Sequence, residues 1–94
     1  MNVLELLQEM EFGIKNHSKS NGGDVAVRTL TIQREVILYL IENKKITASD
    51  DEKVYYDFVR QYTPKDLYKV AEHYRRLKGY APLNYQAYRQ ERLP

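Results

Sequence analysis

The chain has 94 residues, of which 43% are hydrophobic and 30% charged, as is typical of one small folded domain. It has no cysteine, which excludes a disulfide framework and a cysteine-based zinc site, and its longest apolar run, six residues, is far too short to span a membrane. The formal net charge is only +2, yet residues 63–94 hold seven basic and three acidic residues. This asymmetry points mildly to a polyanionic partner. The first twelve residues include acidic but no basic side chains, unlike a signal peptide, so we expect a cytoplasmic protein without membrane contact.

The pattern at the start of the chain predicts a helix from about Val3 to Lys15. Asn2 can cap this helix, and Glu5 stands three residues later, as in a capping box. Apolar residues recur along one stripe, namely Val3, Leu6, Leu7, Met10 and Ile14. Phe12 lies opposite that stripe and is therefore expected on the surface. The polar segment 16–23, with two glycines, is predicted to be a loop.

The segment 24–32 is ambiguous between strand and helix. Its β-branched residues and partial alternation suit a short β segment near 25–30. Alternatively, Asp24 or Thr31 caps the helix that follows. That helix, about 33–45, is better defined, and its apolar side consists of Leu30, Ile37, Leu40 and Ile41.

A third helix is expected after residue 49, because Ser49 and Glu52 have capping-box spacing and two aspartates favour the positive end of the helix dipole. Its predicted buried stripe consists of Val54, Tyr55, Phe58, Val59 and Tyr62.

The clearest helix is predicted from Pro64 to Lys78. Thr63 is its expected N-cap, Pro64 its first residue and Gly79 its C-terminal stop. The predicted apolar stripe consists of Leu67, Val70, Ala71, Tyr74 and Leu77. Beyond it, residues 81–94 form either a tail or a further short helix. We therefore expect residues 1–94 to be a single all-α domain of four or five helices.

Catalytic and metal-binding patterns are weak. His17 and His73 are far apart in sequence, and neither stands at a spacing that matches a metal site. The acidic run 50–52 is explained by helix capping, and the loop 18–24 lacks the phosphate-loop pattern. We therefore expect no enzymatic activity, no catalytic residue, no metal and no cofactor.

The helix 64–78 is the best candidate for a binding surface. In projection, Lys65, Lys69 and Arg76 lie opposite the apolar stripe, while Tyr68 and Arg75 share one flank. Such lysines and arginines can neutralise the phosphates of DNA. An ordinary solvated helix surface explains the same pattern, so the charges alone do not decide.

Three segments resemble the three-helix part of winged helix-turn-helix DNA-binding domains. They read "REVILYLIENKKIT", "SDDEKVYYDFV" and "TPKDLYKVAEHYRRLKGY", within residues 33–80, with a "KIT"-like turn at 45–47 and a "GY" phrase at 79–80. The resemblance implies a helix-turn-helix-like fold with 64–78 as the recognition helix. It implies that the contacts to DNA are Lys65, Tyr68, Lys69, Arg75 and Arg76, with Lys44 and Lys45 as backbone contacts.

The tyrosines permit a second interpretation. Tyr55, Tyr62 and Tyr74 lie on apolar stripes and are assigned to the core, whereas Tyr56 and Tyr68 are expected to be exposed. Exposed tyrosine and arginine are also enriched at protein interfaces. The alternative function is thus a protein–protein interaction module, such as an immunity, inhibitor or adaptor protein, or a self-associating one. Its candidate interface residues are Phe12, Tyr85, Tyr88 and Arg89.

Overall fold

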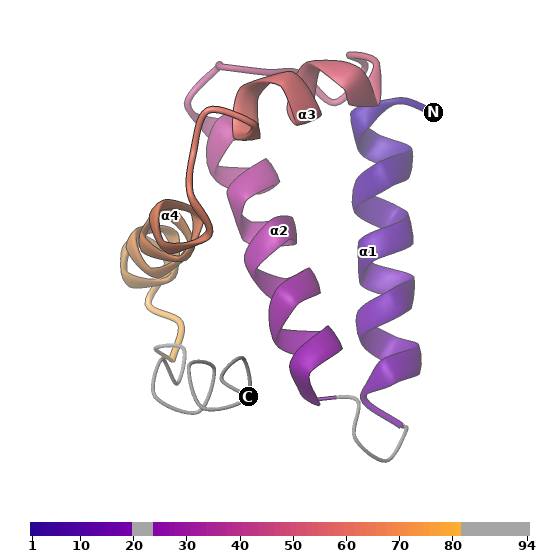
Figure 1. Cartoon of the computed structure of the whole chain (residues 1–94), viewed down its shortest axis with the longest axis vertical. Helices are drawn as coiled ribbons and strands as arrows, with labels where there is room; N and C mark the ends of the chain where they lie inside the picture. Colours follow the sequence, from indigo (N-terminus) through magenta and orange to yellow (C-terminus); the bar gives the residue numbers. More distant parts are fainter. Residues whose placement is uncertain (20–23, 82–94) are drawn as a thin grey trace.

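The computed structural model describes residues 1–19 and 24–81, and these residues form an all-α fold with four helices. The helices are α1 (Val3–His17), α2 (Asp24–Glu42), α3 (Glu52–Val59) and α4 (Pro64–Lys78). Figure 1 shows α2 in the middle, with α1 along one side and α4 crossing the other, while α3 lies across one end. The prediction of an all-α fold is confirmed.

The start of α1 follows the predicted capping box. The Asn2 side chain accepts a hydrogen bond from the Glu5 amide (2.8 Å), and the Glu5 carboxylate accepts one from the Asn2 amide (2.9 Å). The buried side of the helix consists of Val3, Leu6, Leu7 and Met10. Phe12 is 67% exposed, as its position opposite the stripe predicts.

The β segment considered near 25–30 is absent, because these residues form the first turns of α2. The β-branched residues there favour a strand only weakly, and packing between α1 and α4 overrides that preference. Thr31 is not a cap either, since its hydroxyl donates to the Val27 carbonyl (2.6 Å) inside the helix. The helix ends at Glu42, and Lys44 then adopts a left-handed conformation with φ of 59°.

The start of α3 is tied to the start of the chain rather than capped by Ser49. The amide of Val3 donates to the Asp50 carbonyl (2.8 Å), and the Glu52 amide donates to the Met1 carbonyl (3.0 Å). This pairing makes Asp51 the N-cap, and its carboxylate accepts from the Lys53 amide (2.9 Å). The predicted Ser49–Glu52 capping box is therefore wrong.

The predicted buried stripe of α3 is only partly correct. Tyr55 is buried, and this burial raises its pKa to about 12, whereas Val54 and Tyr62 are exposed. The helix ends at Val59 after eight residues, so Tyr62 lies beyond it and no longer follows the helical stripe.

The boundaries of α4 are as predicted. The Thr63 hydroxyl accepts from the Asp66 amide (3.1 Å), the Asp66 carboxylate accepts from the Thr63 amide (3.2 Å), and Gly79 ends the helix with φ of 72°. These hydrogen bonds lower the pKa of Asp66. The predicted apolar stripe is centred near Tyr74, whereas the observed buried face is centred on Ala71, a rotation of roughly 60°. Consequently Tyr68 is buried, at 7% exposed, and Leu77 is 65% exposed; both predictions were wrong.

The core lies on both sides of α2. Ile37, Val36 and Leu40 are almost fully buried there, and Tyr74 of α4 is buried as predicted. Within residues 1–19 and 24–81, no helix combines the length and the apolar character needed to cross a membrane.

Candidate nucleic-acid interface

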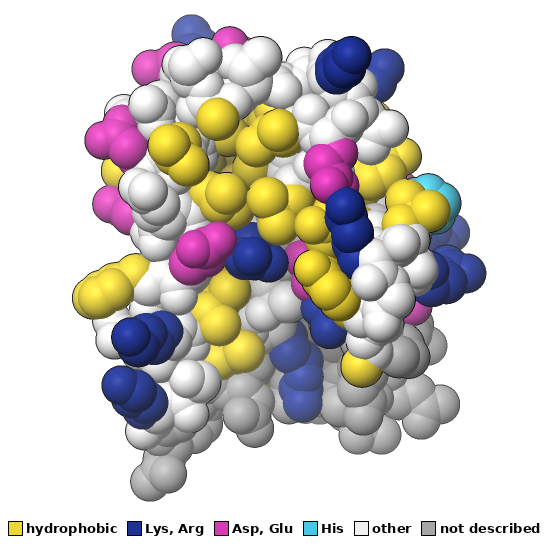
Figure 2. Space-filling model, turned by 180° about the vertical axis from the view of Figure 1, so that it is seen from behind, with side chains coloured by type: hydrophobic (Ala, Val, Ile, Leu, Met, Phe, Trp, Pro, Cys, Tyr) yellow, Lys and Arg dark blue, Asp and Glu magenta, His cyan; other side chains and the backbone are white. Residues whose placement is uncertain are grey.

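Three basic side chains form a row along the outer face of α4. Lys65, Lys69 and Arg76 are exposed, lie within roughly 40° of one another around the helix axis, and span about 16 Å along it. None of the three forms an ion pair with another described residue. Figure 2 shows Lys and Arg side chains gathered with a histidine at the edge where α4 lies. We call Lys65, Lys69 and Arg76 the basic row.

The rotation of α4 removes two predicted contacts from this surface. Tyr68 is buried against the core instead of exposed. Arg75 turns toward α2, where it forms an ion pair with Glu35, and its Nε–H donates to the Ala81 carbonyl (2.6 Å). Lys78 is likewise paired, with Glu42. The inward basic residues are therefore neutralised, and the basic row is what remains for a partner.

Other groups modify the charge of this face. Glu72 lies between Lys69 and Arg76 along the helix axis, roughly 40° to 60° from them around it, which reduces the local positive charge. His73 is exposed, and its ring meets the Tyr39 ring edge-on at 5.7 Å between centroids. The surface is thus basic, but only moderately so.

Lys44 and Lys45 belong to a separate element. Both are exposed in the turn that follows α2. Figure 1 places that end of α2 on the same side of the molecule as α4. They do not belong to the basic row.

The residues expected to contact a protein partner do not come together in the described part of the chain. Phe12 lies on α1, on the other side of α2 from α4. Tyr85, Tyr88 and Arg89 lie outside the described residues.

The sequence analysis missed Glu35, a charged residue in the core. Glu35 is only 2% exposed, and burial raises its pKa, although the charges of Arg75 and Arg34 act in the opposite direction. One of its oxygens pairs with Arg75, whereas the other has no hydrogen-bond partner among the described residues. The signal was a glutamate directly before the apolar run 36–41, because a glutamate is rarely buried without a partner.

Nothing in the described residues suggests a metal centre, since they contain no group of three or more histidine, aspartate or glutamate side chains that could hold an ion. Comparisons of the chain with protein-family models, with curated proteins and with solved structures find no match.

Proposed function

We propose that this protein is a non-enzymatic, DNA-binding regulatory or accessory protein that contacts the phosphate backbone through α4. The observation that carries the proposal is the basic row, three exposed cations opposite the buried face of the helix that form no ion pair within residues 1–19 and 24–81. The neighbouring Arg75 and Lys78 are each paired with a carboxylate of α2. The basic row differs from them because none of its side chains forms an ion pair with another described residue.

The dimensions of α4 support this proposal. The major groove of B-DNA is about 12 Å wide, so a basic row about 16 Å long reaches phosphates on both of its sides. Four residues separate α3 from α4, the turn length of a helix-turn-helix unit. The proposed contacts are Lys65, Lys69 and Arg76, with Lys44 and Lys45 as additional backbone contacts. Tyr68 and Arg75 are left out because they face the core.

A binding titration with random-sequence duplex DNA tests the proposal. We expect the logarithm of the association constant to fall linearly with the logarithm of salt concentration. Lys69→Ala/Arg76→Ala should reduce the slope by about 1.8, because each lost phosphate contact contributes about 0.9. Lys15→Ala/Lys19→Ala is the matched control, since it removes the same charge from exposed positions at the far end of α1. Absence of salt-dependent binding, or an equal change of slope in the control, would contradict the proposal.

The alternative, a protein–protein interaction module, rests on the exposure of Phe12. A phenylalanine that is 67% exposed costs free energy in water, and aromatic anchors are enriched at protein interfaces. For the self-associating form, sedimentation velocity should show a concentration-dependent oligomer that Phe12→Ser abolishes. Leu77→Ser is the matched control, because Leu77 is 65% exposed on α4. A monomer at all concentrations would remove this form of the alternative.

A further inference from the structure

A groove of about 370 Å³ lies between α1, α2 and α4, on the inner side of α4. Its lining includes the guanidinium groups of Arg34 and Arg75, the carboxylates of Glu11 and Glu35, and the Tyr80 ring. The volume falls in the range of small-molecule sites. The basic row does not contribute to it, so the groove is a separate feature of the molecule.

Both guanidinium groups in the groove are held in place by a carboxylate. The Nε of Arg34 lies 3.0 Å from Glu11 Oε1, and a terminal nitrogen of Arg75 contacts Glu35 Oε1. The Arg75 Nε–H also donates to the Ala81 carbonyl (2.6 Å), and the Tyr80 ring centroid lies 5.7 Å from the guanidinium carbon. Fixed side chains lose little conformational entropy on binding a ligand.

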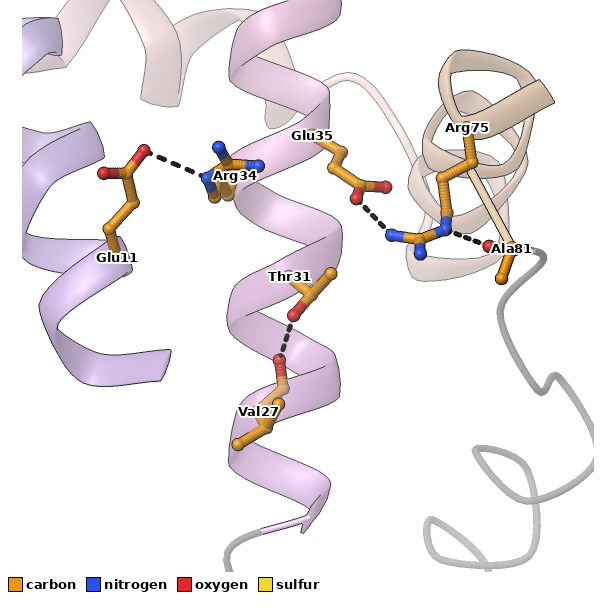
Figure 3. Close-up of polar contacts among 7 residues, drawn as sticks. All are labelled: Glu11, Val27, Thr31, Arg34, Glu35, Arg75 and Ala81. Atoms are coloured by element: carbon orange, nitrogen blue, oxygen red, sulfur yellow. Dashed lines mark hydrogen bonds and ion pairs between the residues drawn. The ribbon is translucent and has the colours of Figure 1, made fainter. Parts of the chain in front are cut away.

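These contacts use only part of the hydrogen-bonding capacity of the two arginines. A guanidinium group carries five N–H donors. Arg34 uses its Nε, and Arg75 uses its Nε and one terminal nitrogen, in contacts with the described residues. In Figure 3, the remaining terminal nitrogens carry no dashed line, and the second terminal nitrogen of Arg75 points away from both of its partners. Unused donors on two cations that line one groove match an anion with several acceptor oxygens.

We propose that this groove binds a small oxyanion, a carboxylate or a phosphate, between Arg34 and Arg75. Glu11 and Glu35, which also line the groove, hold the two guanidinium groups in position through their ion pairs. The same two carboxylates cancel the formal charge of the arginines, so binding depends on directed hydrogen bonds more than on net attraction. The proposal does not depend on DNA binding, because it uses different side chains, and Arg75 lies roughly 100° around the α4 axis from the basic row.

The test is an NMR titration of the ¹⁵N-labelled protein that follows the Nε–H resonances of Arg34 and Arg75. The probes are inorganic phosphate and succinate, with chloride at the same ionic strength as the control. We expect saturable shifts of both resonances with at least one of the two oxyanions, and none with chloride. Saturation by phosphate alone identifies a phosphate site, and saturation by succinate alone identifies a carboxylate site.

Variants separate a specific site from a general salt effect. Arg34→Gln should raise the dissociation constant about tenfold or more, followed at the Arg75 resonance, because hydrogen bonds to charged groups of this kind are worth at least a factor of ten. Arg60→Gln is the matched control, since Arg60 is exposed at the C-cap of α3, does not line the groove and should leave the constant unchanged. If Arg34→Gln is poorly folded by circular dichroism, Arg34→Lys, which keeps the charge but loses the planar fork, should weaken binding in the same direction. Linear, unsaturable shifts, or equal binding by the Arg34 variants, would overturn the proposal.

Discussion

The ion pair between Glu35 and Arg75 should be a main determinant of how α4 is held against α2. Glu35 is 2% exposed and Arg75 19%, so replacing Arg75 with methionine leaves a carboxylate buried without its counter-charge. Breaking a buried pair in this way costs about 3 to 5 kcal/mol. Because Arg75 retains some contact with solvent, we expect the lower end, about 3 kcal/mol, at about pH 8.

The cost should decrease at lower pH. The pKa of Glu35 is already raised by burial, and Arg75 opposes that rise through its charge and hydrogen bond. Without Arg75 the pKa rises further, so the folded protein takes up a proton at a higher pH than the unfolded chain. A carboxyl whose pKa is higher in the folded than in the unfolded protein makes its full contribution to the free energy of unfolding below its unfolded-state pKa. That contribution is lost as the pH rises through its folded-state pKa. Arg75→Met should therefore cost less near pH 5 than near pH 8.

Urea unfolding followed by far-UV circular dichroism measures both effects, as the difference in free energy of unfolding between variant and wild type at each pH. Arg60→Met provides the matched control, because Arg60 pairs with Asp57 at the surface, where such pairs contribute about 0.5 kcal/mol or less. A loss under about 1 kcal/mol for Arg75→Met, or the same loss at both pH values, would refute the buried-pair interpretation.

Further substitutions test the packing and the helix ends. In urea titrations, Tyr68→Ala should reduce the free energy of unfolding by about 3 kcal/mol, because Tyr68 is buried. Tyr62→Ala should reduce it by less than about 1 kcal/mol, because Tyr62 is exposed. Equal losses would contradict the burial of Tyr68 on the inner face of α4. Gly79→Ala should reduce the free energy of unfolding by about 1 kcal/mol, because φ is 72° at this position. An added Cβ meets no atom within 4 Å, so only backbone strain contributes. An unchanged urea midpoint of unfolding would argue against the left-handed cap. Thr63→Ala should cost about 1 kcal/mol through loss of the N-cap, and Thr63→Ser should restore most of it.

Local signals along the chain were sufficient to predict the all-α fold, the start of the first helix and both ends of the last. The capping box of Asn2 and Glu5, and the sequence Thr63-Pro64 with Gly79 downstream, depend on hydrogen bonds and φ angles within a few residues. Such interactions form wherever the segment lies in the fold. The sequence therefore carries them explicitly.

The errors arose where distant segments decide the structure. Asp51 rather than Ser49 caps α3 because residues near Met1 pair with that segment, and no local pattern reveals such a pairing. The buried face of α4 is rotated toward Tyr68 because Arg75 pairs with Glu35, forty residues earlier in the chain. A helical projection counts apolar residues only, so it missed a face that includes a buried ion pair.

The same rotation reshapes the candidate site. Of the α4 residues expected to contact DNA, the basic row stays on the surface, whereas Tyr68 and Arg75 face inward. Glu35 and Arg34, which line the groove, were not expected as site residues, although a glutamate that directly precedes a long apolar run can signal a buried pair.

Mapping the DNA-binding surface by NMR tests the proposed function most directly. A short duplex is titrated into the ¹⁵N-labelled protein at low salt, and the backbone amide shifts are assigned along the chain. The proposal predicts that the largest shifts fall at Lys65, Lys69 and Arg76, with smaller ones at residues 44–45, and that added salt reverses them. Shifts centred on Phe12 and its neighbours on α1, or no shifts at any DNA concentration, would contradict it.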